Sequence, residues 1–169
     1  MIKPEAIRAA FIYALFALLI LAAGCTAGSS SPAAQKNSPN MYDVLNSQRI
    51  EIFINNAKEI GDIQAEIMSG ESADSPKAQA LNKKTGWSSD QTRVMAMAII
   101  AATELQADPN LAAIYGLPPV SKEQKALINK HQPALDSAVK VYKDSMANTF
   151  RQREKAGKKV PYRRSPNQS

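Results

Sequence analysis

The middle of this chain carries nine consecutive apolar residues, Val94–Ala102. Ser88 and Gln91 precede the run with the spacing of a capping box, in which each side chain bonds the other residue's backbone N–H and a helix begins. A helix that is apolar on every side has no face for water, so other elements must surround it. We therefore predict that Val94–Ala102 belongs to a buried central helix.

Helical patterns also fill the chain before this run. Apolar side chains recur at three- and four-residue steps over residues 42–69, which is the period of an amphipathic helix. Gly61 lies inside that stretch and costs about 1 kcal/mol relative to Ala. Pro76, a residue favoured at the first helical position, opens a second helix over residues 76–85. Both segments are predicted to be helices.

The chain after the central run is predicted to be helical as well. A short helical turn is expected over residues 109–115, and a long last helix from Ser121. Pro133 should break that helix near residues 131–132, because the residue before a proline disfavours helical backbone. Alternating strand patterns are absent. We expect an all-α fold with one small helical bundle of four to five helices over residues 42–156.

The N-terminal residues have the features of a secretory signal. Lys3 and Arg8 precede a fifteen-residue apolar run over residues 9–23. A helix that spans a bilayer needs about 20 apolar residues, so the run fits a signal sequence better than a spanning helix. An uncleaved anchor is the less favoured interpretation.

The end of this run resembles the lipobox of bacterial lipoproteins. The residues are Leu21-Ala22-Ala23-Gly24-Cys25, with Ala22 where Leu is the most frequent residue. The resemblance, which covers only the first 25 residues, implies that residues 1–24 are a signal peptide and that Cys25 is acylated and becomes the mature N-terminus. An ordinary cleaved signal with an incidental cysteine is the alternative.

The residues that follow Cys25 predict a tether. In a Gram-negative host, the resemblance to bacterial lipoproteins implies sorting to the outer membrane, because the residue after the cysteine is Thr26 and not Asp. Residues 25–41 are rich in Ser, Ala, Pro and Asn, which is typical of a flexible linker. Fifteen such residues have an r.m.s. reach of roughly 20 Å. Cys25 is the only cysteine, so we expect packing rather than disulfides to stabilise the domain.

Positive charge gathers at the C-terminal end of the chain. Residues 151–169 hold seven basic residues and one acid, a net charge of +6, whereas residues 26–150 hold twelve basic and thirteen acidic residues, a net charge of −1. We expect a basic, disordered tail over residues 157–169. The candidate residues for binding an anionic surface are Arg151, Arg153, Lys155, Lys158, Lys159, Arg163 and Arg164.

Residue types that carry catalysis or bind metals are scarce. His131 is the only histidine and is expected to be a packed or half-buried structural residue. Glu59, Asp62 and Glu66 lie on neighbouring helical turns and are expected to form a solvated face. Trp87, between two helices, is expected to close the end of the bundle, with an exposed binding anchor as the alternative. We expect no catalytic residue, metal ion or cofactor.

These observations favour a protein with a binding or structural role, held on a membrane through its acylated cysteine. The expected location is the periplasmic side of the outer membrane, and the candidate partners are an anionic envelope surface or a protein. Nucleic acid is not expected as a partner there. An alternative is an accessory lipoprotein that pilots an outer-membrane protein during secretion or assembly. The basic tail could also serve solubility alone.

Overall fold

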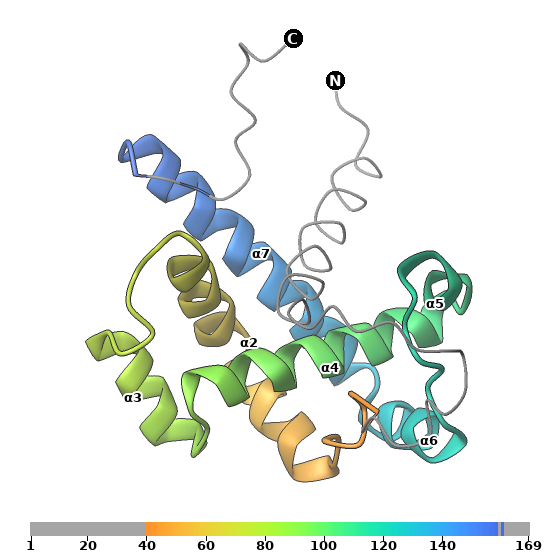
Figure 1. Cartoon of the computed structure of the whole chain (residues 1–169). Helices are drawn as coiled ribbons and strands as arrows, with labels where there is room; N and C mark the ends of the chain where they lie inside the picture. The colour runs from red at the N-terminus through yellow and green to blue at the C-terminus, as the bar shows by residue number, and fades with distance from the viewer. Residues whose placement is uncertain (1–39, 159, 161–169) are drawn as a thin grey trace, which may run out of the picture. The chain divides into compact units, whose positions relative to one another are not determined.

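The computed structural model describes residues 40–158 and residue 160. These residues form six α-helices and no strand (Figure 1), which confirms the all-α fold with one helix more than the expected four to five. Contacts within the chain separate residues 1–40 from residues 41–169. The helices are α2 (Ser47–Met68), α3 (Pro76–Thr85), α4 (Ser89–Ala107), α5 (Asn110–Tyr115), α6 (Lys122–His131) and α7 (Ala134–Lys155).

Helix α4 contacts each of the other five described helices, as a central helix must. Its capping box is present: the Ser88 hydroxyl accepts a hydrogen bond from the Gln91 backbone at 3.2 Å, and the Gln91 side chain accepts one from the Ser88 backbone at 2.9 Å. Complete burial was the wrong expectation, because Val94 is 43% exposed. Five neighbours still leave one side of α4 open to solvent.

Helices α2 and α7 form the most extensive helix pair, each 22 residues long. Gly61 makes their close approach possible: a Cβ atom there would lie 2.6 Å from the backbone oxygen of Tyr142. Phe53 and Tyr142 are buried between the helices with their ring centroids 5.9 Å apart. The absence of a side chain at Gly61 therefore offsets its low helix propensity.

Two helix boundaries follow from local chemistry. Helix α2 begins at Ser47, later than the predicted residue 42, because the Asn46 side chain caps it by accepting a hydrogen bond from the Arg49 backbone. The last helix is divided as predicted: α6 ends at His131 and α7 begins just after Pro133. This division also accounts for the additional helix.

The exposure of the side chains tests the predictions for Trp87 and His131. Trp87 is buried between α3 and α4, as expected for a structural residue. His131 is half-buried, as expected. Helix α5, in contrast, has no buried residue.

The predicted signal peptide, Cys25, the linker up to residue 39 and residues 159 and 161–169 lie outside the described residues.

Candidate functional site

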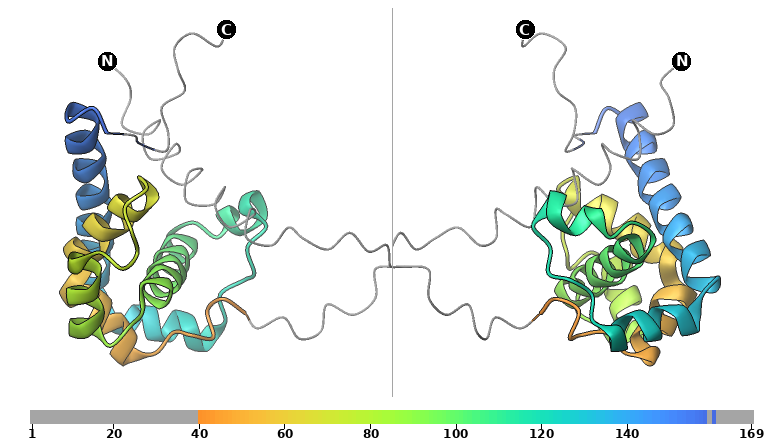
Figure 2. Two further views of the ribbon diagram at one scale, coloured as in Figure 1. Left: turned by 60° about the vertical axis from the view of Figure 1, so that its left-hand side comes forward. Right: turned by 90° about the vertical axis from the view of Figure 1, so that its right-hand side faces the viewer.

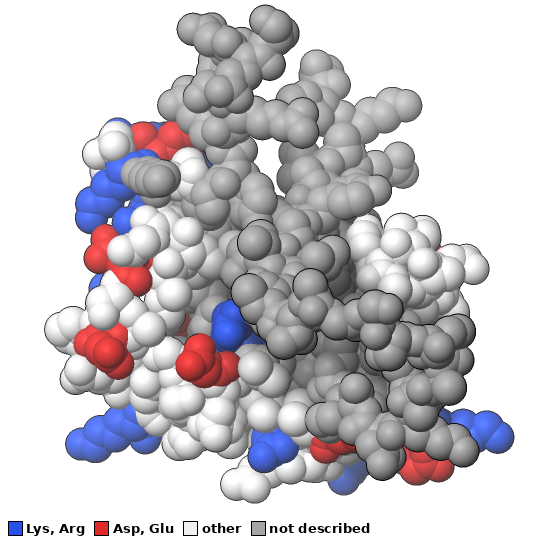
Figure 3. All heavy atoms as spheres, in the orientation of Figure 1, with Lys and Arg blue, Asp and Glu red and all other residues white. Residues whose placement is uncertain are grey.

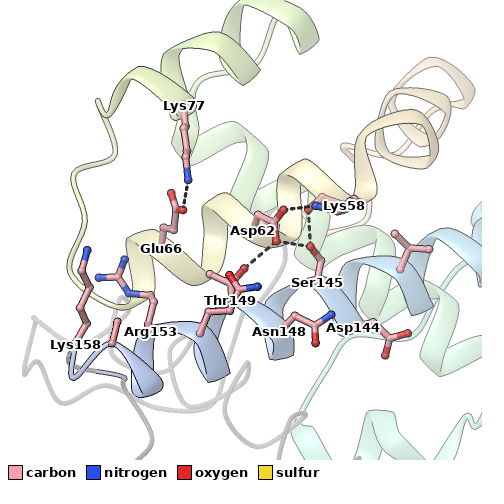
Figure 4. Close-up of a pocket in the computed structure, with 13 residues that line it drawn as sticks. Lys58, Asp62, Glu66, Lys77, Asp144, Ser145, Asn148, Thr149, Arg153 and Lys158 are labelled. Atoms are coloured by element: carbon pink, nitrogen blue, oxygen red, sulfur yellow. Dashed lines mark hydrogen bonds and ion pairs between the residues drawn. The ribbon is translucent and has the colours of Figure 1, made fainter.

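A polar groove follows the line where α2 and α7 meet (Figure 4). It is open to solvent, has a volume of about 580 Å³, and contains charges of both signs. One wall comes from α2 and the other from α7, while Lys77 reaches in from α3. The side chains that carry its chemistry are Lys58, Asp62, Glu66, Lys77, Asp144, Ser145, Asn148, Thr149, Arg153 and Lys158.

Asp62 is the most connected side chain of the groove. Its carboxylate accepts hydrogen bonds from the Lys58 ammonium at 2.8 Å and from the hydroxyls of Ser145 at 2.5 Å and Thr149 at 2.8 Å. Burial alone would raise the pKa of Asp62, but these hydrogen bonds outweigh it and hold the pKa below its ordinary value. Asp62 therefore joins α2 to α7 as a carboxylate.

The expectation that Glu59, Asp62 and Glu66 form one solvated face is wrong for two of them. The Asp62 side chain is only 33% exposed, and the Glu66 side chain is less exposed still and pairs with Lys77 at 2.6 Å. Glu59 is half exposed and pairs with Lys84. The reason is that α7 and α3 pack beside this face of α2 and bring hydroxyl and ammonium groups to it.

The end of the groove near the C-terminus of α7 is basic. Arg153 donates to Glu71 at 2.9 Å, and Lys158 lies 3.6 Å from the same carboxylate. The hydrogen bond and charge of Arg153, with the charge of Lys158, lower the pKa of Glu71. Lys77 and its partner Glu66 line the same groove as Arg153 and Lys158 (Figure 4). Three cations thus face two carboxylates at this end.

The candidate basic residues are in different situations. The Arg153 side chain is only 12% exposed and is held by Glu71, so it belongs to the fold. Arg151 is exposed and donates to Asn148 at 2.6 Å, and Lys155 is exposed on the last turn of α7. The structure brings Arg153 and Lys158 together at one carboxylate; Lys159, Arg163 and Arg164 lie outside the described residues.

Sequence reasoning missed several members of the groove. Ser145 and Thr149 lie 83 and 87 residues from Asp62 along the chain, and Glu71, which does not line the groove but pairs with Arg153, lies 82 residues from that arginine. One signal was available, because Ser145 and Thr149 are four residues apart and lie on one face of the last predicted helix. That spacing indicates a shared small polar patch, although it does not identify the partner carboxylate.

The groove contains side chains that could bind groups of either charge, but the hydroxyls of Ser145 and Thr149 already donate hydrogen bonds within the protein. The Ser145 hydroxyl has one proton and two acceptors in reach, Asp62 and the Lys58 carbonyl at 2.9 Å. His131, on α6, does not line the groove. Within residues 40–158, no cluster of three or more His, Cys, Asp or Glu side chains could hold a metal ion.

Two further findings concern membrane spans and similarity to known proteins. Among the described residues, no helix has both the length and the apolar character needed to cross a membrane. Comparison with protein-family models, with curated proteins and with solved structures finds no match to the chain.

Proposed function

We propose that the mature protein is a lipoprotein of the cell envelope with a binding or structural role. It is tethered by acylated Cys25, on the periplasmic side of the outer membrane. The observation that carries the proposal is the lipobox-like run Leu21-Ala22-Ala23-Gly24-Cys25 at the end of an apolar segment. Each buried CH₂ of an acyl chain contributes about 0.8 kcal/mol, so two or three chains hold a protein far more firmly than one.

The second part of the proposal concerns the basic C-terminal end of the domain, which contacts an anionic surface of the envelope. Arg151 and Lys155 are exposed on the last turns of α7. Each Lys or Arg near an anionic membrane contributes about 1 kcal/mol, and salt screens the effect. Because Glu71 holds Arg153 and Lys158, the cations assigned to this contact are Arg151, Lys155, Lys159, Arg163 and Arg164.

Metabolic labelling with a clickable fatty acid tests the anchor. We expect the wild-type protein to carry the label and to fractionate with the outer membrane. The Cys25→Ser variant should lose the label and retain its signal peptide, while Thr26→Ser, the matched control, should behave as wild type. An unlabelled wild-type protein of mature size would contradict the anchor.

Retention on purified cell wall and on anionic vesicles tests the basic surface. Replacing the five assigned cations by Gln should reduce retention at low salt, with Arg153 and Lys158 left in place because Glu71 already pairs with them. The control removes the same charge from exposed lysines elsewhere: Lys83, Lys122, Lys125, Lys130 and Lys140. Equal retention of both variants would contradict a dedicated basic surface, and the two matrices distinguish cell-wall polymer from lipid.

A further inference from the structure

An uncharged apolar segment projects from the domain without burying any residue. The α5 segment, Leu111–Pro119, comprises nine residues that include no charged side chain, and it covers most of α5 and the loop that follows. Ile114 is 62% exposed, the highest value among the exposed large apolar residues. In Figure 3 the surface over α5 is largely white, whereas blue and red side chains mark the side of α3.

Local hydrogen bonds help to hold this segment in shape, in which five of the nine residues are half-buried and none is fully buried. The Asp108 carboxylate accepts from the Asn110 backbone at 3.0 Å, and the Leu117 backbone donates to the Ala112 carbonyl at 2.9 Å. Gly116 closes the helix in the left-handed conformation. The segment is therefore ordered before it meets a partner. Exposed apolar patches can mark interaction sites, which makes the surface around Ile114 a candidate.

The point at which the linker joins the domain indicates which partner the α5 segment contacts. The leading segment, residues 41–46, lies beside the first turn of α6, where Gln124 donates to Asp43 at 3.5 Å. In both views of Figure 2 this orange segment and α5 lie on the side of the domain opposite α7. Asn40 follows Cys25 by only fifteen positions, about 50 Å even when the chain is fully extended. The linker therefore keeps the start of the domain within about 50 Å of the membrane that holds Cys25.

We infer that the α5 segment docks into the lipid surface of the membrane that carries the anchor. This inference rests on the proposed lipidation of Cys25. Insertion requires no charge to be desolvated, since residues 111–119 carry none. Tyr115 offers an apolar ring and a polar hydroxyl, the combination that favours the boundary between head groups and hydrocarbon. The tether raises the effective concentration of lipid at α5, so a small apolar contact suffices.

Fluorescence quenching on vesicles tests the inference with the full mature protein. Acylation blocks the sulfur of Cys25, so an introduced cysteine is the only thiol available for an environment-sensitive dye. Ile114→Cys carries the probe, and Val141→Cys is the matched control, because Val141 is an apolar residue on α7 that is 44% exposed. The proteins are reconstituted into phosphatidylethanolamine and phosphatidylglycerol vesicles that contain nitroxide-labelled lipid.

We expect several-fold stronger quenching at position 114 than at position 141. Equal quenching at the two positions, on protein that floats with the vesicles, overturns the α5 inference and leaves the anchor standing. Reaction of wild-type Cys25 with the dye shows that the anchor itself has failed, and the inference falls with it. A photo-crosslinker at position 114 that captures one protein in cells, and no lipid, overturns the assignment to lipid.

Discussion

Between α2 and α7, the large side chains Phe53 and Tyr142 are buried against each other, whereas in the α5 segment Leu111 and Leu117 are only half-buried and Ile114 is exposed. Both regions are rich in apolar residues, but only the first contributes to the core. Removing a buried side chain costs transfer free energy and leaves a cavity, while removing an exposed one costs neither. The buried side chains therefore maintain the fold, whereas the exposed Ile114 can contact a partner.

The largest expected effect is a loss of stability in Phe53→Ala that Ile114→Ala does not share. Loss of the buried Phe53 ring should lower the free energy of unfolding by about 3–5 kcal/mol, whereas the exposed Ile114 should change it by less than about 0.5 kcal/mol. Urea unfolding followed by fluorescence of the single, buried Trp87 measures both. Similar losses in the two variants would break the distinction between core and contact surface.

Gly61→Ala tests how closely α2 and α7 approach. The new methyl group would clash with the Tyr142 carbonyl, an overpacking that typically costs about 1–3 kcal/mol. The gain in helix propensity of about 1 kcal/mol opposes this cost. We expect a net loss of stability in urea; a more stable variant would show that the two helices are not in contact at this point.

Asp62→Asn should lower stability by about 1–2 kcal/mol near neutral pH, because the carboxylate is an acceptor for two hydroxyls and an ammonium group. Asp62 has a lowered pKa in the folded state, so its contribution is present above the ordinary Asp pKa of about 3.9 and is lost as the pH falls through the folded value.

The difference in stability between wild type and Asp62→Asn should therefore shrink in acid, which urea titrations at several pH values would reveal. Asp74→Asn is the control, because Asp74 is exposed and does not line the groove. A difference that stays constant with pH would contradict the role of the charged carboxylate.

Glu71→Gln should have the smallest effect on stability, because the Glu71 pairs with Arg153 and Lys158 are partly exposed. The loss in melting temperature should be smaller than that of Asp62→Asn and should disappear at high salt. The same change frees two cations, so retention on anionic vesicles should increase. Unchanged retention would indicate that this end of α7 does not contact the anionic surface.

Features that depend on adjacent residues could be predicted from the sequence. The capping box at Ser88, the helix start at Pro76 and the break before Pro133 all involve groups a few residues apart. Local propensity determines such features with little help from tertiary packing. Trp87 could be assigned to the core because a large ring between two helices buries most area there.

Features that depend on which helices meet could not be predicted. The environment of Asp62 is created by Ser145 and Thr149, which reach it only because α7 packs along α2. Nine apolar residues in a row likewise predicted complete burial, yet the exposure of Val94 depends on where the five neighbours of α4 lie. The lipid anchor and the basic contact surface remain predictions.

Helix α7 and the leading segment lie on different sides of the domain, which affects where the proposed contacts can form. The leading segment lies on one side of the domain, and α7, which carries the exposed cations Arg151 and Lys155, lies on the opposite side. A helix of 22 residues is about 33 Å long. With α5 docked in the anchoring membrane, the cations of α7 would lie on the side of the domain that is turned away from that membrane.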